Sequence, residues 1–151
     1  MQQPNTMLLQ MKQQSGARWF YWIGGLSLIN TMSAFANWKM NFVIGLGITQ
    51  LVDQTAINLS GQLPAAKYIA LAIDILISGL FFVFGALAKN GHNWAYIVGM
   101  AVYALDGLIF LVAGKMLGVG FHAFALYFIF SGLKAAQALA QLNSTTDKSG
   151  T

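Results

Sequence analysis

The chain contains no cysteine and no glutamate, and only 8% of its 151 residues are charged. Without thiols it cannot form disulfides, hold an iron–sulfur cluster or build a thiolate zinc site, so thiol oxidoreductases are excluded. Without glutamate it cannot form the Glu-x-x-His sites of di-iron helical bundles. Soluble globular domains carry about 25% charged residues, so the low charge also excludes an ordinary soluble fold.

Apolar residues make up 57% of the chain, and they occur in long runs separated by short polar breaks. A helix that spans a bilayer needs about 20 mostly apolar residues, whereas a barrel strand needs about ten that alternate in polarity. The runs fit helices, so we predict an all-α fold: a polytopic integral membrane helical bundle with four to five transmembrane helices. The expected segments cover residues 18–36, 41–59, 68–88, 94–114 and 121–139.

This division gives the chain three regions. Residues 1–17 form a polar N-terminal tail, residues 18–140 the transmembrane helical bundle, and residues 141–151 a polar C-terminal tail. Lysines lie in the breaks between segments, where their side chains reach the membrane interface. The formal net charge of +4 indicates contact with anionic lipid headgroups and not with nucleic acid. We therefore expect the lipid bilayer as partner, in a bacterial inner (cytoplasmic) membrane.

The second segment, residues 41–59, is unusually polar for a membrane span. Gln50, Asp53 and Gln54 share one helix face by their three- and four-residue spacing. This helix would cross the membrane only with that face turned into the bundle, or would lie re-entrant or interfacial. Five spans divide the eight lysines and arginines equally between the two membrane sides, whereas four spans place more of them inside. The positive-inside rule favours four spans, and both versions stay open.

Three of the four aspartates lie inside predicted membrane segments, namely Asp53, Asp74 and Asp106. An ionised side chain at the centre of a membrane helix costs about 2.5 to 3.5 kcal/mol, so other interactions should offset this penalty. Because consecutive spans run antiparallel, Asp74, Asp106 and His122 are expected at similar depths in one half of the bilayer.

These residues predict a polar cavity that opens to one membrane face and binds protons, cations or a polar headgroup. The predicted site consists of Asp53, Asp74, Asp106, His122, Gln50, Gln54 and Tyr103. In the structural alternative, the aspartates are protonated or hydrogen-bonded and hold the helices together. The hydroxyl of Thr31, in the first segment, is expected to bond back to its own helix.

We therefore expect a proton- or cation-linked transport or channel component, which would need a homo-oligomer or a membrane-protein partner to complete a pathway. The alternative is a non-catalytic accessory or assembly subunit of a larger membrane complex. An intramembrane enzyme acting on lipid headgroups is less favoured because it would need a metal, and the sequence leaves the metal undecided. No cofactor motif occurs among the seven methionines and eleven phenylalanines, so no cofactor is expected.

Overall fold

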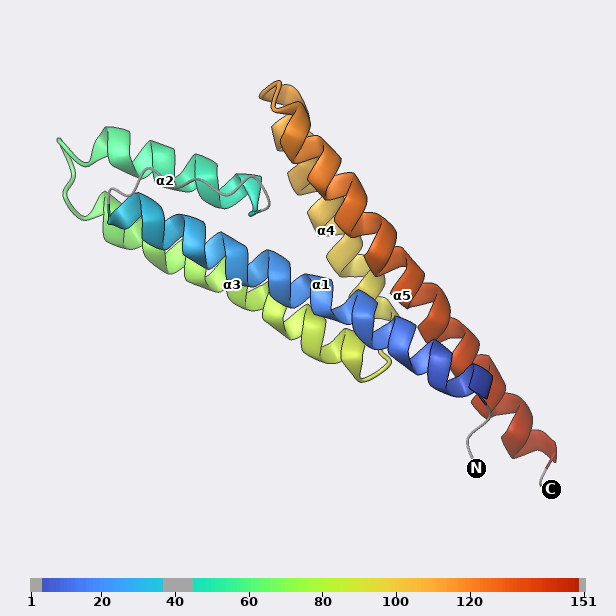
Figure 1. Ribbon diagram of the computed structural model, residues 1–151. Helices are drawn as coiled ribbons and strands as arrows, with labels where there is room; N and C mark the ends of the chain where they lie inside the picture. Colours follow the sequence, from blue (N-terminus) through green and yellow to red (C-terminus); the bar gives the residue numbers. More distant parts are fainter. Residues whose placement is uncertain (1–3, 37–44, 150–151) are drawn as a thin grey trace.

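The computed structural model describes residues 4–36 and 45–149, and all regular structure in these ranges is α-helical (Figure 1). The helices are α1 (Pro4–Phe35), α2 (Gly47–Leu59), α3 (Ala66–Lys89), α4 (Asn93–Val112) and α5 (Met116–Ser149). Each helix overlaps one of the five predicted segments. The prediction of an all-α helical bundle is therefore confirmed.

Three of these helices, α3, α4 and α5, are long and apolar enough to cross a membrane. Helix α1 has 32 residues, but it is less apolar than these three and does not belong to the set. Helix α2 has only 13 residues. At about 1.5 Å per residue it rises about 20 Å, which is less than the roughly 30 Å of a bilayer's hydrocarbon core.

The helices form two arms that meet at one end of the molecule, as Figure 1 shows. Helices α1 and α3 lie side by side in one arm, and α4 packs against α5 in the other. The arms join where the first half of α1 crosses the second half of α5, with Gly16 against Gly132. A Cβ atom placed on Gly16 would lie 2.6 Å from the Cα atom of Gly132, so the two backbones are in direct contact.

An aromatic cluster fills the junction between the arms. The ring of Phe20 on α1 lies about 6 Å from the rings of Phe81 and Phe84 on α3 and of Tyr96 on α4. Gly99 leaves room for this ring, because a Cβ atom there would lie 2.5 Å from a ring carbon of Phe20. The core of the bundle is therefore built around α1, although α1 is the least apolar of the long helices.

The segment expected as an N-terminal tail, residues 1–17, is helical from Pro4 onward and belongs to the bundle. The side-chain nitrogen of Gln13 donates to the carbonyl oxygens of Ala88, at 3.4 Å, and Lys89, at 3.3 Å. The hydroxyl of Tyr96 donates to the backbone oxygen of Gln13 at 2.6 Å. Because the last carbonyls of a helix lack partners within it, Gln13 completes the end of α3. Helix α5 likewise continues through the expected C-terminal tail to Ser149.

Helix α2 runs parallel to α1 and covers only half of its length. The backbone nitrogen of Leu46, just before α2, donates to the hydroxyl oxygen of Ser27 near the middle of α1 at 2.8 Å. Further along, Asp53 lies beside Thr31, and the last turn of α2 reaches the end of α1. Figure 1 shows the start of α2 turned toward α4 and its end beside the start of α3. The first part of the expected second segment, 41–44, lies outside the described residues.

Candidate functional site

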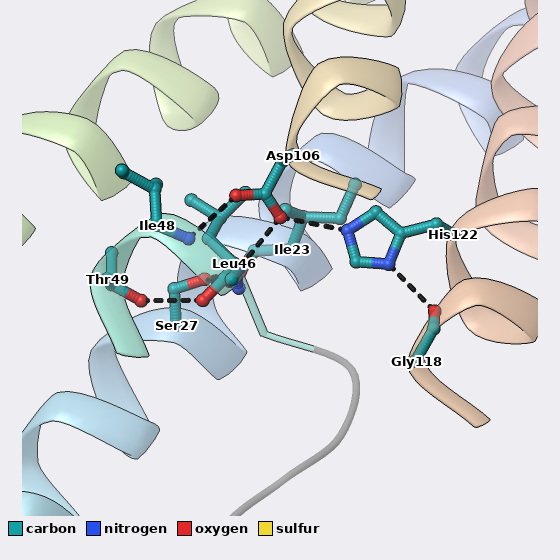
Figure 2. Close-up of polar contacts among 9 residues, drawn as sticks. Ile23, Ser27, Leu46, Ile48, Thr49, Asp106, Gly118 and His122 are labelled. Carbon is teal, nitrogen blue, oxygen red and sulfur yellow. Dashed lines mark hydrogen bonds and ion pairs between the residues drawn. The ribbon is translucent and has the colours of Figure 1, made fainter. Parts of the chain in front are cut away.

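The buried start of α2 is held by a carboxylate from another helix (Figure 2). Asp106 on α4 accepts the backbone N–H of Gly47 on Oδ2 and that of Ile48 on Oδ1, both at 2.8 Å. The first N–H groups of a helix have no partner within it and carry partial positive charge. Leu46, the residue before α2, provides no side-chain cap. Asp106 therefore caps α2 from outside it.

His122 on α5 completes this arrangement, which we call the capping cluster: Asp106, His122 and the first N–H groups of α2. Atom Nε2 of His122 lies 2.9 Å from Oδ2 of Asp106, and Nδ1 lies 2.8 Å from the carbonyl oxygen of Gly118. Because a carbonyl oxygen only accepts, Nδ1 carries a proton. The contact between Nε2 and the carboxylate joins α5 to the acid that caps α2.

Two aromatic rings of α4 lie against His122. The ring of Tyr103 stacks on it with centroids 4.2 Å apart, and the ring of Phe110 lies at 5.0 Å. His122 is 3% exposed and Tyr103 is fully buried. Within the described residues, the hydroxyl of Tyr103 makes no hydrogen bond. The carboxylate of Asp106 already contacts the N–H groups of Gly47 and Ile48 and the imidazole of His122. Its charge is therefore compensated by groups of the capping cluster itself.

A second group of polar side chains lies between α1, α2 and α3, and we call its two acids, Asp53 and Asp74, the carboxyl pair. The hydroxyl of Thr31 donates to Oδ2 of Asp74 at 2.9 Å. Asp53 on α2 lies against the same carboxyl and the same hydroxyl. Asp74 is fully buried and Asp53 is 8% exposed. Two carboxylates that share a buried site cannot both be ionised at low cost, so the pair favours holding a proton.

Two buried oxygen atoms on the inner face of α3 lack partners in the described part of the chain. They are Oδ1 of Asp74 and, one helical turn later, the hydroxyl oxygen of Ser78. Most buried polar atoms in proteins are hydrogen-bonded to protein or to water. A proton on one of the two neighbouring carboxyls would turn their contact into a hydrogen bond.

A small cavity of about 40 Å³ adjoins Asp53 of the carboxyl pair. It is lined by residues of α1, α2 and α3, namely Ala34, Phe35, Asp53, Ala56, Ile57, Lys67 and Ala70. Ile57 and Lys67 are exposed, so the cavity lies at the surface where α1 ends and α3 begins. One water molecule takes up about 30 Å³ in the liquid, so the cavity has room for about one water next to Asp53.

The predicted site is therefore divided into two clusters, which are connected through α2. The carboxyl pair joins Asp53 to Asp74, and the capping cluster joins Asp106 to His122, with Tyr103 stacked on the imidazole. Among the described residues, no three histidine or aspartate side chains converge as a metal site would require.

The two glutamines of the predicted site lie outside both clusters. Gln50 is half-buried, and Gln54 is exposed, with its amide 3.5 Å from the side-chain oxygen of Asn58. The buried face of α2 instead carries Thr49, Asp53 and Ala56. Thr49 can be buried because its hydroxyl donates to the carbonyl of Leu46 at 2.9 Å. The buried face of α2 therefore shares Asp53 with the expected face but leaves Gln54 exposed.

Sequence reasoning missed two hydroxyl groups on α1. Thr31 was expected to bond to its own helix but donates to Asp74. Ser27 does bond back, to the carbonyl of Ile23, and also accepts the N–H of Leu46. The available signal was their four-residue spacing, which places both on one face of α1.

No family model matches the chain, and neither a curated protein nor a solved structure matches it. Its function is therefore to be sought in the chemistry of the carboxyl pair and the capping cluster.

Proposed function

We propose that the protein is a proton-linked transport component of a membrane, with the carboxyl pair as its proton-binding site. The observation that supports this proposal is the contact between Asp53 on α2 and Asp74 on α3, both buried, beside a cavity at the surface. A buried carboxyl pair costs little when it holds one proton and much when it holds none. Such a pair takes up and releases a proton when water reaches it.

A proton suits this pair better than a divalent cation. Calcium takes about six to eight oxygen ligands, and magnesium requires near-octahedral coordination. In the described part of the chain, the oxygen atoms at this place come from Asp53, Asp74 and Thr31. One proton neutralises half of the pair without any further ligand, so no additional oxygen atoms are needed.

We propose four membrane crossings, made by α1, α3, α4 and α5, with α2 as a re-entrant half-helix. Helix α1 belongs with the apolar three because its inner face buries Ser27 and Thr31, while Trp22, Ile29 and Met32 are exposed. Helix α2 starts inside the bundle and ends where α3 begins. This arrangement is the four-span version of the predicted fold.

The charges suggest an orientation for these crossings. Most of the cationic residues lie toward the end where α1 begins, among them Lys12, Arg18, Lys89 and Lys134. Of the described lysines, Lys67 and Lys115 lie at the opposite ends of the helices. By the positive-inside rule the first end is cytoplasmic, so the carboxyl pair would open away from the cytoplasm. A bacterial cytoplasmic membrane remains part of this proposal.

The accessory-subunit alternative is favoured by a different observation, the capping cluster. All three donors to the carboxylate of Asp106 come from within the chain, so this intramembrane acid already holds helices together. If the carboxyl pair did the same in a permanently protonated state, the protein would serve assembly and not transport.

The test is proton flux into liposomes that contain the purified protein and a pH-sensitive dye, driven by a potassium diffusion potential. We expect the unmodified protein to carry protons. The flux should be at least about tenfold lower in both Asp53→Asn and Asp74→Asn, because an amide cannot take up and release the proton. Gln54→Ala is the matched control, since Gln54 is the exposed neighbour of Asp53 on the same helix.

Flux that is unchanged in both aspartate variants, or equally reduced in Gln54→Ala, would overturn the carboxyl pair as a proton site. Each variant must retain the helical content and the elution volume of the unmodified protein. The accessory-subunit alternative would be supported if the unmodified protein carried no flux and the protein were purified in a stable complex with another membrane protein. Repeating the assay with a sodium-sensitive dye in place of the pH-sensitive dye distinguishes proton from sodium movement.

A further inference from the structure

A second hollow lies far from the carboxyl pair, on the outer surface between α1 and α5. This groove has a volume of about 350 Å³ and opens outward. Its main lining residues are Leu9, Lys12, Tyr127, Phe130, Ser131 and Lys134. We call it the basic groove. It lies next to the contact of Gly16 with Gly132, where the backbones of α1 and α5 come close together. Larger side chains of both helices line the groove beside this contact.

The lining combines cations and hydroxyl groups with an apolar wall. Lys12 comes from α1 and Lys134 from α5, so two helices supply one positive charge each. The ammonium group of Lys134 lies 5.0 Å from the centre of the Phe130 ring, which holds it at the groove. Tyr127 and Ser131 add hydroxyl donors. Because Ser131 follows Tyr127 by four residues and precedes Lys134 by three, all three lie on the same face of α5.

Within the described part of the chain, no acidic side chain lines the basic groove. Its charge therefore favours an anion and disfavours a ligand that carries its own cation, because that cation would lie close to two ammonium groups. The exposed rings of Phe130 and Tyr127 offer a surface on which a hydrocarbon chain can lie. The groove thus matches a ligand with an anionic head and an apolar tail.

The groove lies at the depth of lipid headgroups if α5 crosses the membrane. Lys134 stands about 27 Å along α5 from its first residue, Met116, at 1.5 Å per residue. The hydrocarbon core is about 30 Å thick, so Lys134 would reach the headgroup level opposite the start of the helix. Tyr127 lies two turns, or about 10 Å, deeper, within the hydrocarbon core where acyl chains lie.

We propose that the basic groove binds an anionic phospholipid. Its phosphate would accept hydrogen bonds from Lys12, Lys134 and Ser131, and one acyl chain would lie against Tyr127 and Phe130. This site is separate from the carboxyl pair, and its occupancy can be measured without any flux assay.

Native mass spectrometry of the delipidated protein tests this site. The protein is titrated with phosphatidylglycerol or phosphatidylcholine of identical acyl chains, and bound lipids are counted. We expect at least a tenfold preference for phosphatidylglycerol, and a roughly tenfold weaker preference in the double variant Lys12→Gln/Lys134→Gln. Lys115→Gln is the control, because Lys115 is a described lysine that lies outside the groove, at the start of α5.

Three results would overturn the proposal. The first is equal binding of both lipids by the unmodified protein, which indicates an unspecific lipid shell. The second is a loss of preference in Lys115→Gln as large as in the double variant. The third is displacement of the lipid by millimolar inorganic phosphate, which indicates a site for free phosphate and not for a lipid. Retained lipid under phosphate, with the loss confined to the double variant, supports the lipid site.

Discussion

Oδ1 of Asp106 accepts the backbone N–H of Ile48 at 2.8 Å, so a carboxylate on α4 stabilises the start of a helix 58 residues earlier in the chain. Its other oxygen accepts the N–H of Gly47 and contacts His122. Three donors and the positive end of a helix compensate the cost of burying this charge. The strongest functional signal in the sequence, an acid within an apolar segment, therefore has a structural explanation at this position.

Asp106→Ala should destabilise the protein by about 3 to 5 kcal/mol, because it leaves two backbone N–H groups and the imidazole of His122 buried without their acceptor. The measurement is reversible unfolding in mixed micelles, combined with amide hydrogen exchange. We expect exchange at Gly47 and Ile48 to accelerate most.

Asp106→Asn keeps one acceptor oxygen, so its free energy of unfolding should lie between those of the unmodified protein and Asp106→Ala. Unchanged exchange at the start of α2 in Asp106→Ala would show that the cap does not hold this helix.

Ser27→Ala should cost about 1 to 3 kcal/mol in the free energy of unfolding, because the N–H of Leu46 loses its acceptor inside the bundle. Ser144→Ala is the matched control. Ser144 also donates to a carbonyl of its own helix, but it is exposed, so its replacement should cost less than about 0.5 kcal/mol. Equal effects of the two substitutions would contradict the role assigned to Ser27.

Glycine replacements should act with opposite signs at two positions. A Cβ atom at Gly132 would lie 2.8 Å from the Cα atom of Gly16, so Gly132→Ala forces α1 and α5 apart and should cost about 1 to 3 kcal/mol. A Cβ atom at Gly79 meets nothing within 4 Å, and Gly79→Ala should stabilise α3 by about 0.5 to 1 kcal/mol. Thermal unfolding of both variants in detergent would decide this, and the contact would be refuted if Gly132→Ala were neutral.

Gln13→Ala should lower the free energy of unfolding by about 1 to 2 kcal/mol, because the side-chain amide no longer bonds the last carbonyls of α3. Gln14→Ala, at the exposed neighbouring position, should leave it nearly unchanged. Denaturant unfolding of the pair would measure the difference. Indistinguishable midpoints would mean that the first turns of α1 do not contribute to the bundle.

Hydropathy was sufficient to predict the five helices, because a long apolar run in a chain with little charge allows few other structures. It failed at Gln13, because a Gln-rich segment looks like a solvated tail until a partner helix end is known. It also failed for the rotation of α2. Spacing shows that Gln50, Asp53 and Gln54 are neighbours, but the buried face carries Thr49, Asp53 and Ala56.

The candidate site was predictable in its residue types and not in its connections. Three acids within apolar segments indicated a costly feature at Asp53, Asp74 and Asp106. That two of them meet while the third caps a helix depends on where α2 enters the bundle, which no local pattern encodes. Thr31 illustrates the same limit, because only the position of α3 shows that its hydroxyl bonds Asp74.

The joining of α1 and α5 at one end has a practical consequence for labelling experiments. Since α1 begins and α5 ends on that same side, the proposed four crossings would expose reporter proteins fused near Pro4 and near Ser149 to one and the same compartment. With these crossings, a pair of split-fluorophore halves attached at the two positions would assemble within a single molecule, whereas a half inserted at the turn around Gly114 would be separated from both by the membrane.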